Sequence, residues 1–573
     1  MKHGEIISLA GKWRFRLDQD QLGEHFREQL DAPWQFDARW MDWAHDDSQW
    51  EEINVPAHWQ VEGYDYNGAA WYRCRFENPL GLGERLWVVF EGVDYFSDVW
   101  LNDRYLGSHE GYFASFGYEI TPYLKTEQNL LVVRVDSPND ICGKERQVWQ
   151  LKNQLKGALQ RWDMNDTHVN PGGIWNNVYL RKSGPAAIKD IKVHTHIPQF
   201  PPLDETNLPV PVSASIQVSL SGSLPSDVGR ESTLQIRVAP KNFEGESVTI
   251  TQTVQLLRES STWQAPLQLR KARLWYTWDL GIPALYEVEV SLILDGQEID
   301  RAAQTIGFRQ IERLEGWETR LNGIRFFQRG ANYLSEQLLS TMTFERYQRD
   351  LELIVGANLN TIHPFAVVEK HEFYDLCDQY GVLVYQDIPI WLQASNSGDL
   401  VRRAVQQVNE LISQYGHHPS ICIWNFGSQP SVANFTKLAS AMACAARELD
   451  PCRIIHQANS ILDPTGKRYD PLGDFFWKDE TIQDFKTRFD WRVDTHQYYG
   501  WYYQKDFREL YCLPKEYFQL VTEYGAQALP EEEFLKRIIP KEGLFPPDWR
   551  YYTIRNFQPE HQFDYIPQPT SLE

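Results

Sequence analysis

The sequence predicts a multidomain chain of mixed β and α/β class, in which two β-sandwiches precede a (β/α)8 barrel. Its 573 residues exceed what one hydrophobic core can hold. Short alternating apolar runs dominate the first 310 residues, whereas helix-period segments alternate with buried strands beyond them. We therefore expect domains at residues 1–184, 185–310 and 311–573.

The first domain is expected to be a jelly-roll β-sandwich. Residues 85–121 alternate apolar and polar side chains in short runs that Gly, Asn-Asp and Ser interrupt, and "NLLVVRVDS" predicts a further strand. A helical pattern first occurs at residues 146–159. Short strands with frequent turns are typical of a sandwich or jelly roll.

The second domain is expected to be an immunoglobulin-like β-sandwich. The runs "IKDIKVHTHI", "VSASIQVSLSG", "STLQIRVAP" and "YEVEVSLILDGQEI" follow one another at regular spacing, separated by Pro, Gly and Ser. Their number and length fit a sandwich of about 100 residues.

The third domain is expected to be a (β/α)8-type barrel of parallel βα units. Residues 343–358 and 397–416 carry apolar side chains at helical spacing, and short apolar runs such as "GVLVYQDIP" and "ICIWNFG" predict buried strands.

The chemistry of such a barrel gathers at the carboxyl ends of its strands. That rule alone selects a set of amide, imidazole, hydroxyl and carboxylate side chains, namely Asn332, Tyr333, His363, Asp387, Ser428, Gln429, Asn459, His496, Tyr498 and Glu523. A loop residue that caps a helix is the alternative for any one of them. Together they are expected to converge on one mouth.

Charge and composition argue against several functions. The net charge is −22 and no Lys/Arg cluster occurs, so nucleic acid is not an expected partner. The N-terminus lacks the apolar core of a signal peptide, and no stretch approaches about 18 apolar residues, so no membrane span is expected. Seven Cys without CxxC spacing predict neither a disulfide framework nor a zinc site, and the cytoplasm is the expected compartment.

Two further features bear on ligands. Aromatic residues make up 14% of the chain, and their rings stack on the apolar faces of sugars as well as filling β-sandwich cores. No metal motif occurs, and the pair His417-His418, which precedes Pro419, is expected to form a helix C-cap. No cofactor is implied.

Several stretches resemble glycoside hydrolase family 2 in chain order. "FEGVDYFSDVWLNDRYLGSHEGYFASFGYEIT" and "NPGGIWNNVYL" are similar to its sugar-binding jelly roll, "LWYTWDLGIPALYEVEVSL" to its sandwich-to-barrel junction, and "GANLNTIHPF", "HHPSICIWNFG" and "VTEYGAQALP" to its barrel. The family contains β-galactosidases, β-glucuronidases and β-mannosidases, which are retaining enzymes with two catalytic Glu residues. The resemblance implies a carbohydrate or glycoside ligand and hydrolysis of an O-glycosyl bond, in which one carboxyl protonates the leaving oxygen while the other attacks the anomeric carbon.

The resemblance also implies roles for particular residues. Glu523 in "VTEYG" matches the nucleophile, and His496 and Tyr498 match contacts to the bound sugar. Further substrate contacts are expected from Ser428, Asn332, His363, Asp387, Trp501 and Asp163. The last of these lies on a jelly-roll loop that the family sends toward the barrel mouth, with a turn or helix cap as the alternative.

The resemblance also implies that the barrel lacks its last strand and helix, because the family usually continues beyond the point where this sequence stops. An open barrel exposes an edge and part of its core. The chain is therefore expected to be a fragment, to share its barrel with another chain, or to close the fold by another route.

The chain departs from the family at the acid/base position as well. Relatives read Asn-Glu where this sequence has Ser428-Gln429, and many have Arg where His363 is expected to end the third barrel strand. Glutamine donates and accepts hydrogen bonds but cannot release a proton to a glycosidic oxygen, a loss that typically costs about 10²–10⁴-fold in rate.

Three interpretations follow from this departure. Another group, such as Asp387, Glu369 or His363 on a neighbouring strand end, supplies the proton. Alternatively, a weakened enzyme uses Glu523 with leaving groups that need no proton, or the chain is a non-catalytic carbohydrate-binding pseudoenzyme. The sequence leaves the sugar and the oligomeric state open, a homo-oligomer included.

Overall fold

The computed structural model describes most of the chain, and every structural statement below concerns that part. It covers residues 2–20, 23, 39–139, 152–159, 169–221, 230–257, 260–314, 318–391, 394–395, 397–428, 435–459, 494–497, 520–524, 531–545, 548 and 550–551. Four expected site residues, Gln429, Tyr498, Trp501 and Asp163, lie outside the described residues.

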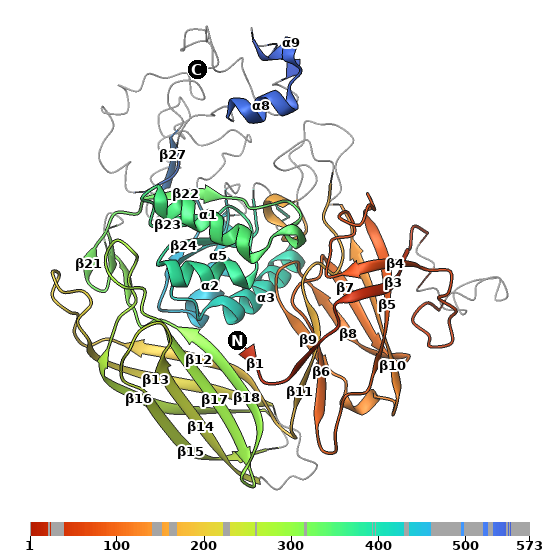
Figure 1. Cartoon of the computed structure of the whole chain (residues 1–573), viewed down its shortest axis with the longest axis horizontal. Coiled ribbons are helices and arrows are strands. Elements are labelled where there is room, and N and C mark those ends of the chain that lie inside the picture. The colour runs from red at the N-terminus through yellow and green to blue at the C-terminus, as the bar shows by residue number, and fades with distance from the viewer. Residues whose placement is uncertain are drawn as a thin grey trace.

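The first domain is a sandwich of two antiparallel sheets, drawn in red and orange in Figure 1. One sheet has the order β4-β3-β5-β10-β7-β8 and the other the order β2-β11-β6-β9. Buried and half-buried side chains alternate along β7, as expected where one face of a strand meets the core. The strands are β2 (Ile6–Ser8), β3 (Gly11–Leu17), β4 (Glu51–Val55), β5 (Gly68–Glu77), β6 (Arg85–Phe90), β7 (Phe96–Leu101), β8 (Arg104–Glu110), β9 (Phe116–Glu119), β10 (Gln128–Ser137) and β11 (Val178–Ser183).

The second domain is also a sandwich, with sheet orders β1-β18-β17-β14-β15 and β12-β13-β16. Its edge strand β1 comes from the start of the chain, where Lys2 pairs with Ala303 of β18. The strands are β1 (Lys2–His3), β12 (Ala187–His196), β13 (Val210–Ser221), β14 (Arg230–Pro240), β15 (Val248–Leu256), β16 (Ser261–Ala272), β17 (Tyr286–Leu294) and β18 (Gln297–Ile306). Both predicted sandwiches are confirmed, while the exact domain boundaries stay predictions.

The third domain is built on a parallel sheet with the order β22-β23-β24-β25-β26, preceded by a small antiparallel sheet β19-β20-β21. A separate parallel pair, β27 and β28, follows. The strands are β19 (Ile311–Arg313), β20 (Thr319–Leu321), β21 (Ile324–Arg325), β22 (Gly330–Tyr333), β23 (Thr361–Pro364), β24 (Leu383–Asp387), β25 (Ile421–Asn425), β26 (Ile454–His456), β27 (Asp494–Gln497) and β28 (Leu520–Tyr524). Strands β23, β24 and β25 are buried along their whole length, which is typical of parallel strands covered by helices.

Helices accompany the parallel strands, and the two that the sequence predicted are present. Thr343 caps one of them by accepting a hydrogen bond from the Arg346 amide, and Ser397 caps the other through the Leu400 amide. The helices are α1 (Phe344–Gly356), α2 (His371–Tyr380), α3 (Gly398–Tyr415), α5 (Ser440–Leu449), α8 (Glu532–Ile538) and α9 (Lys541–Leu544). Among the helices so described, none is long and apolar enough to cross a membrane.

Three local predictions are wrong. His363 lies on β23, the second strand of the parallel sheet and not the third, because the strands before β22 form their own antiparallel sheet. Residues 152–159 contain a β-bridge at Lys152 and one 3₁₀ turn, and no α-helix, because Lys152 pairs with Ala394. The C-cap of α3 is Gly416 and not His417-His418. The predicted loss of a last strand concerns residues largely outside those the structure describes.

Candidate active site

Asp387 is the centre of a buried hydrogen-bond network at the carboxyl ends of the parallel strands. It ends β24 and is fully buried. Its Oδ1 accepts from His363 Nε2 at 2.8 Å and from Asn425 Nδ2 at 2.7 Å, and its Oδ2 accepts from the Ala366 amide at 2.8 Å. Because donors occupy both oxygens, Asp387 serves as an acceptor that fixes its neighbours.

His363 connects this carboxylate to β22. Its Nδ1 lies 2.8 Å from Asn332 Oδ1, and the edge of Tyr385 packs against the imidazole with ring centroids 4.4 Å apart. With Nε2 donating to Asp387, Nδ1 is the ring nitrogen that faces Asn332. Asn332, His363 and Asp387 were all predicted at the barrel mouth, and the structure brings them together.

A second imidazole lies nearby at the end of β26. His456 accepts a hydrogen bond from the Tyr385 hydroxyl through Nδ1. Burial, with smaller contributions from Arg313 and His363, lowers the pKa of His456 to about 3, so the ring is neutral at pH 7. Sequence reasoning missed Tyr385, although the alternation of β24 puts it on the same face as Asp387.

Trp391, Ser428 and Asn459 form a row across the exits of three neighbouring strands. Ser428 pairs with Trp391 on one side and with Asn459 on the other. The backbone N–H of Ser428 donates to the Ile390 carbonyl at 2.9 Å, and the backbone N–H of Asn459 donates to the Gly427 carbonyl at 3.0 Å. The side chains of Ser428 and Asn459 are fully buried. Both were expected at the mouth, whereas Trp391 was missed because it follows β24 by four residues.

Glu523 lies in β28 and is 7% exposed. The parallel register pairs it with His496 of β27, the residue that the family resemblance assigns to sugar contact. A catalytic carboxylate in a barrel belongs at this end of a strand. The roles of Glu523 and His496 stay predictions.

Glu369 lies on the helix side of the sheet and not at the mouth. Ser335 Oγ lies 2.9 and 2.8 Å from its two carboxylate oxygens, and the Tyr347 hydroxyl of α1 donates to it at 2.7 Å. Its amide donates to the Tyr374 hydroxyl, which in turn donates to Gln386 Oε1 at 2.6 Å. Burial raises the pKa of Glu369 to about 7 against the lowering effect of these hydroxyls. Glu369 does follow β23, as expected, but it does not face the mouth, because its carboxylate bonds to Ser335 and to Tyr347 of α1.

A loop of the first sandwich reaches the mouth. The Ala158 amide donates to the Ala366 carbonyl at 3.2 Å, and Ala158 packs with Phe365, Ala366 and Trp391. Gly157 has a φ of +61°, and a Cβ there would overlap the Ala366 carbonyl oxygen. Lys152 Nζ lies 5.1 Å from the centroid of the Trp391 ring. This part of the loop therefore walls the mouth next to Trp391.

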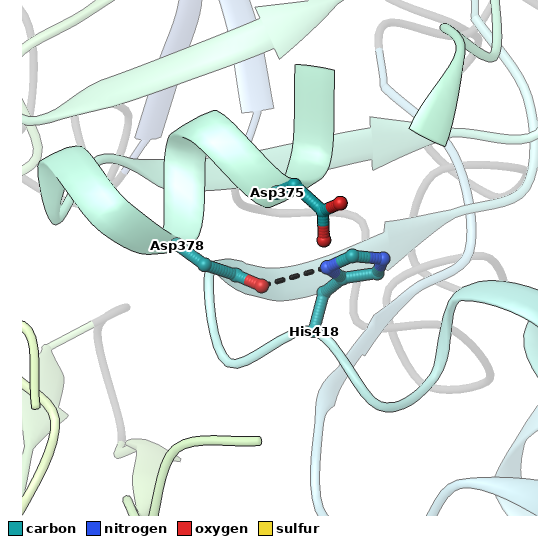
Figure 2. Close-up of side chains that lie close together, drawn as sticks. All are labelled: Asp375, Asp378 and His418. Carbon is teal, nitrogen blue, oxygen red and sulfur yellow. Dashed lines mark hydrogen bonds and ion pairs between the residues drawn. The ribbon is translucent and has the colours of Figure 1, made fainter. Parts of the chain in front are cut away.

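Three acidic and imidazole side chains also gather at the opposite end of the sheet. Figure 2 shows Asp375 and Asp378 on α2 and His418 on the loop that leads into β25, with candidate ligand atoms within 4.8 Å of one another. Asp378 Oδ2 lies 2.7 Å from His418 Nδ1, and its Oδ1 accepts from the Ser420 amide at 2.9 Å. Asp378 thus ties α2 to this loop, while His418 Nε2 has no hydrogen-bond partner among the described residues.

Three family models match consecutive stretches of the chain. The glycosyl hydrolase 2 galactose-binding domain-like model matches residues 57–186, the glycosyl hydrolases family 2 model residues 205–309, and the family 2 TIM barrel model residues 314–566. Two sandwiches and a TIM barrel in this order define a multidomain member of the glycosyl hydrolases. The chain belongs to glycoside hydrolase family 2.

Curated relatives are similar but longer. A putative β-glucuronidase of Formosa agariphila is 24% identical over 78% of this chain and 52% of its own length. A β-galactosidase of Vibrio cholerae is 25% identical over 75% of this chain and 41% of its own length. A solved putative β-galactosidase of Bacteroides fragilis has a TM-score of 0.69 and 21% identity, covering 92% of this chain and 72% of that one. The chain thus spans about half the length of the curated relatives that it matches.

Proposed function

We propose that this protein acts on the β-glycosidic bond of a carbohydrate or glycoside, with Glu523 as the nucleophile of a retaining reaction. The observation that carries the proposal is a buried carboxylate within the strand pair that also holds His496. In a family 2 barrel this is where the attacking group belongs. The Glu523 carboxylate forms a bond to the anomeric carbon as the bond from that carbon to the glycosidic oxygen breaks, and water then hydrolyses the glycosyl-enzyme ester to release the sugar.

The proton for the leaving group comes from elsewhere than Gln429. Of the three candidates, Glu369 faces the helices and Asp387 accepts hydrogen bonds at both oxygens. His363 is the remaining candidate. Asp387 orients its ring through Nε2 as a carboxylate orients the imidazole of a catalytic dyad, and Nδ1 contacts the neutral Oδ1 of Asn332, whose place a glycosidic oxygen can take. We assign to His363 Nδ1, on the side of Asn332, the task of donating a proton to the glycosidic oxygen.

A non-catalytic carbohydrate-binding protein is the alternative. The amide of Gln429 favours it, because an amide keeps hydrogen bonds to a sugar while removing the acid that hydrolysis needs. Glu523 would then be a hydrogen-bond acceptor for a bound hydroxyl group.

Substrates whose leaving group needs no protonation distinguish the hydrolase from the binding protein. We expect release of nitrophenol from at least one of the nitrophenyl β-mannoside, galactoside, glucoside and glucuronide, and Glu523→Gln should abolish it. Glu205→Gln, an exposed position in the second sandwich, is the control and should change nothing. Absence of turnover across the panel would rule out the enzyme and leave the binding protein.

The proton donor is tested with methyl glycosides, whose leaving group needs protonation. Gln429→Glu should raise their turnover by about 10²–10⁴-fold, with a smaller gain on nitrophenyl substrates. His363→Gln should lower methyl glycoside turnover in the wild-type background and spare the nitrophenyl substrates. Equal loss on both substrate types would show that His363 has another role.

We further propose a cytoplasmic, reducing location. The described cysteines Cys74, Cys377, Cys422, Cys444 and Cys452 are all free thiols, which suits a reduced compartment. Fractionation of cells that express the full gene, with thiol labelling of each fraction, tests this proposal.

A further inference from the structure

Four buried polar atoms around Gly427 have no hydrogen-bond partner in the described structure. They are Asn425 Oδ1, Ser428 Oγ, and both Nδ2 and Oδ1 of Asn459. All three side chains are fully buried. Gly427 links two of these residues, because its carbonyl accepts from the backbone N–H of Asn459 at 3.0 Å and from the side-chain Nδ2 of Asn425 at 3.3 Å.

Such a concentration of unmet polar atoms has a cost for the folded chain. Buried donors and acceptors are nearly always paired, and each unpaired one carries its desolvation penalty. Unpaired groups that gather at the strand exits of a barrel, where ligands bind, indicate that a bound molecule supplies the missing partners.

The atoms specify the chemistry of that molecule. The Asp387 carboxylate engages Asn425 Nδ2, so the amide oxygen is the free atom and needs a donor. Asn459 offers one donor and one acceptor, and Ser428 offers a hydroxyl that does both. A carboxylate or phosphate has no proton to give to two amide oxygens. Hydroxyl groups donate and accept, and Trp391, paired with Ser428, adds an aromatic ring at the end of the row.

We propose that Asn459 is a specificity-determining residue that binds two adjacent hydroxyl groups of an uncharged sugar, supported by Ser428 and Asn425. The inference rests on the proposed function in one respect: it takes the bound molecule that carries these hydroxyl groups to be the sugar of the glycoside. It assigns a substrate contact to the exit of β26, to which the family resemblance gave no role.

The test compares two buried asparagines. Asn459→Leu removes unpaired polar atoms and should leave the Tm of the free protein unchanged or higher, while it weakens binding of a methyl β-glycoside by about tenfold or more. The control is Asn129→Leu in the first sandwich, which is equally buried but bonds to Lys125 and Asn102. It should lower the Tm and leave sugar binding unchanged.

Binding is measured by calorimetry with the methyl β-mannoside, galactoside, glucoside and glucuronide in the Glu523→Gln background. The inference is overturned if no glycoside binds, if Asn459→Leu binds as tightly as its parent, or if it lowers the Tm as far as Asn129→Leu does. Asn459-dependent binding in a protein that never releases nitrophenol would support the inference and refute only the hydrolytic function. Preference for the glucuronide would contradict the uncharged ligand.

Discussion

Gln386 and Asp387 are neighbours in β24, yet they serve different networks. Successive side chains of a strand point to opposite faces. Gln386 accepts from Tyr374 of α2, while Asp387 accepts from His363 and Asn425. The strand therefore presents one amide to the helix layer and one carboxylate to the mouth, and only the second bears on chemistry.

Glu369 provides a pH-dependent prediction at the residue scale. Its pKa rises from 4.5 to about 7 on folding, so between these pH values the folded state holds a proton that the unfolded state has lost. The stability contribution is present at low pH and is lost as the pH rises toward 7. Glu369→Gln mimics the neutral form, and should gain on the order of 3 kcal/mol relative to wild type between pH 4.5 and pH 8.

Urea midpoints of both proteins across that range measure the effect. The exposed control Glu205→Gln should show no such trend. A difference between Glu369→Gln and wild type that stays constant with pH would contradict the shifted pKa.

The strand-end rule predicted which positions along the chain lie at the carboxyl ends of strands, but it did not predict which way each side chain faces. It selected Asn332, His363 and Asp387, which meet, because carboxyl ends of parallel strands share one edge. It also selected Tyr333, which does not face the mouth, because its hydroxyl donates to Asp350 of α1 and its ring stacks on Phe373 of α2. It also missed Trp391, because this residue lies in the loop after β24, where no alternating pattern indicates which side chains point to the mouth.

At the scale of elements, capping and hydrophobic period decided which helices were predictable. The segments that became α1 and α3 combine a Thr or Ser N-cap with a clear apolar face, and both were foreseen. Helix α2 has no side-chain N-cap bond and α5 has none either, so neither was derived from its periodicity. The loop at 152–159 shows the reverse, because a tertiary β-bridge overrides a local helical pattern.

Gly157 is the element-scale test of how the sandwich loop meets the mouth. Gly157→Ala would place an alanine in a left-handed backbone conformation, with its Cβ overlapping the Ala366 carbonyl oxygen. The substitution should therefore destabilise the protein by about 1–3 kcal/mol. Gly356→Ala at the end of α1 meets nothing within 4 Å and should be neutral or slightly stabilising. Thermal unfolding of both variants checks the prediction, and equal Tm values would show that the loop does not dock this way.

At the scale of the whole molecule, part of the aromatic excess joins domains. Trp275 Nε1 donates to the Asp378 carbonyl at 2.9 Å, and Trp278 Nε1 donates to the Leu359 carbonyl at 2.9 Å. Both indoles come from the segment after the second sandwich's β16 and bond to the barrel domain. On the other side, Arg403 of α3 pairs with Glu110 of the first sandwich. The high aromatic content was read as cores or sugar contacts, and this third use depends on tertiary contacts that composition does not reveal.

Trp275→Phe is expected to loosen the junction between the second sandwich and the barrel. It removes one buried N–H donor and part of a fully buried ring, and should cost about 1–3 kcal/mol. Calorimetry should show a lower and broader transition as the two domains unfold less cooperatively. Trp263→Phe, whose indole bonds to Ser261 within its own strand, is the control and should keep a single sharp transition.

The pairing of β1 with β18 has a consequence for dissecting the protein. Lys2–His3 occupies the outer edge of a sheet whose other strands lie far along the chain, between Arg230 and Ile306. A recombinant piece that begins at the second sandwich would leave β18 with an open row of backbone donors and acceptors, which invites pairing between molecules. Cutting the second sandwich out at its linkers would therefore remove the strand that covers β18 at Ala302 and Ala303, so this domain is not separable from the start of the chain without loss of backbone pairing.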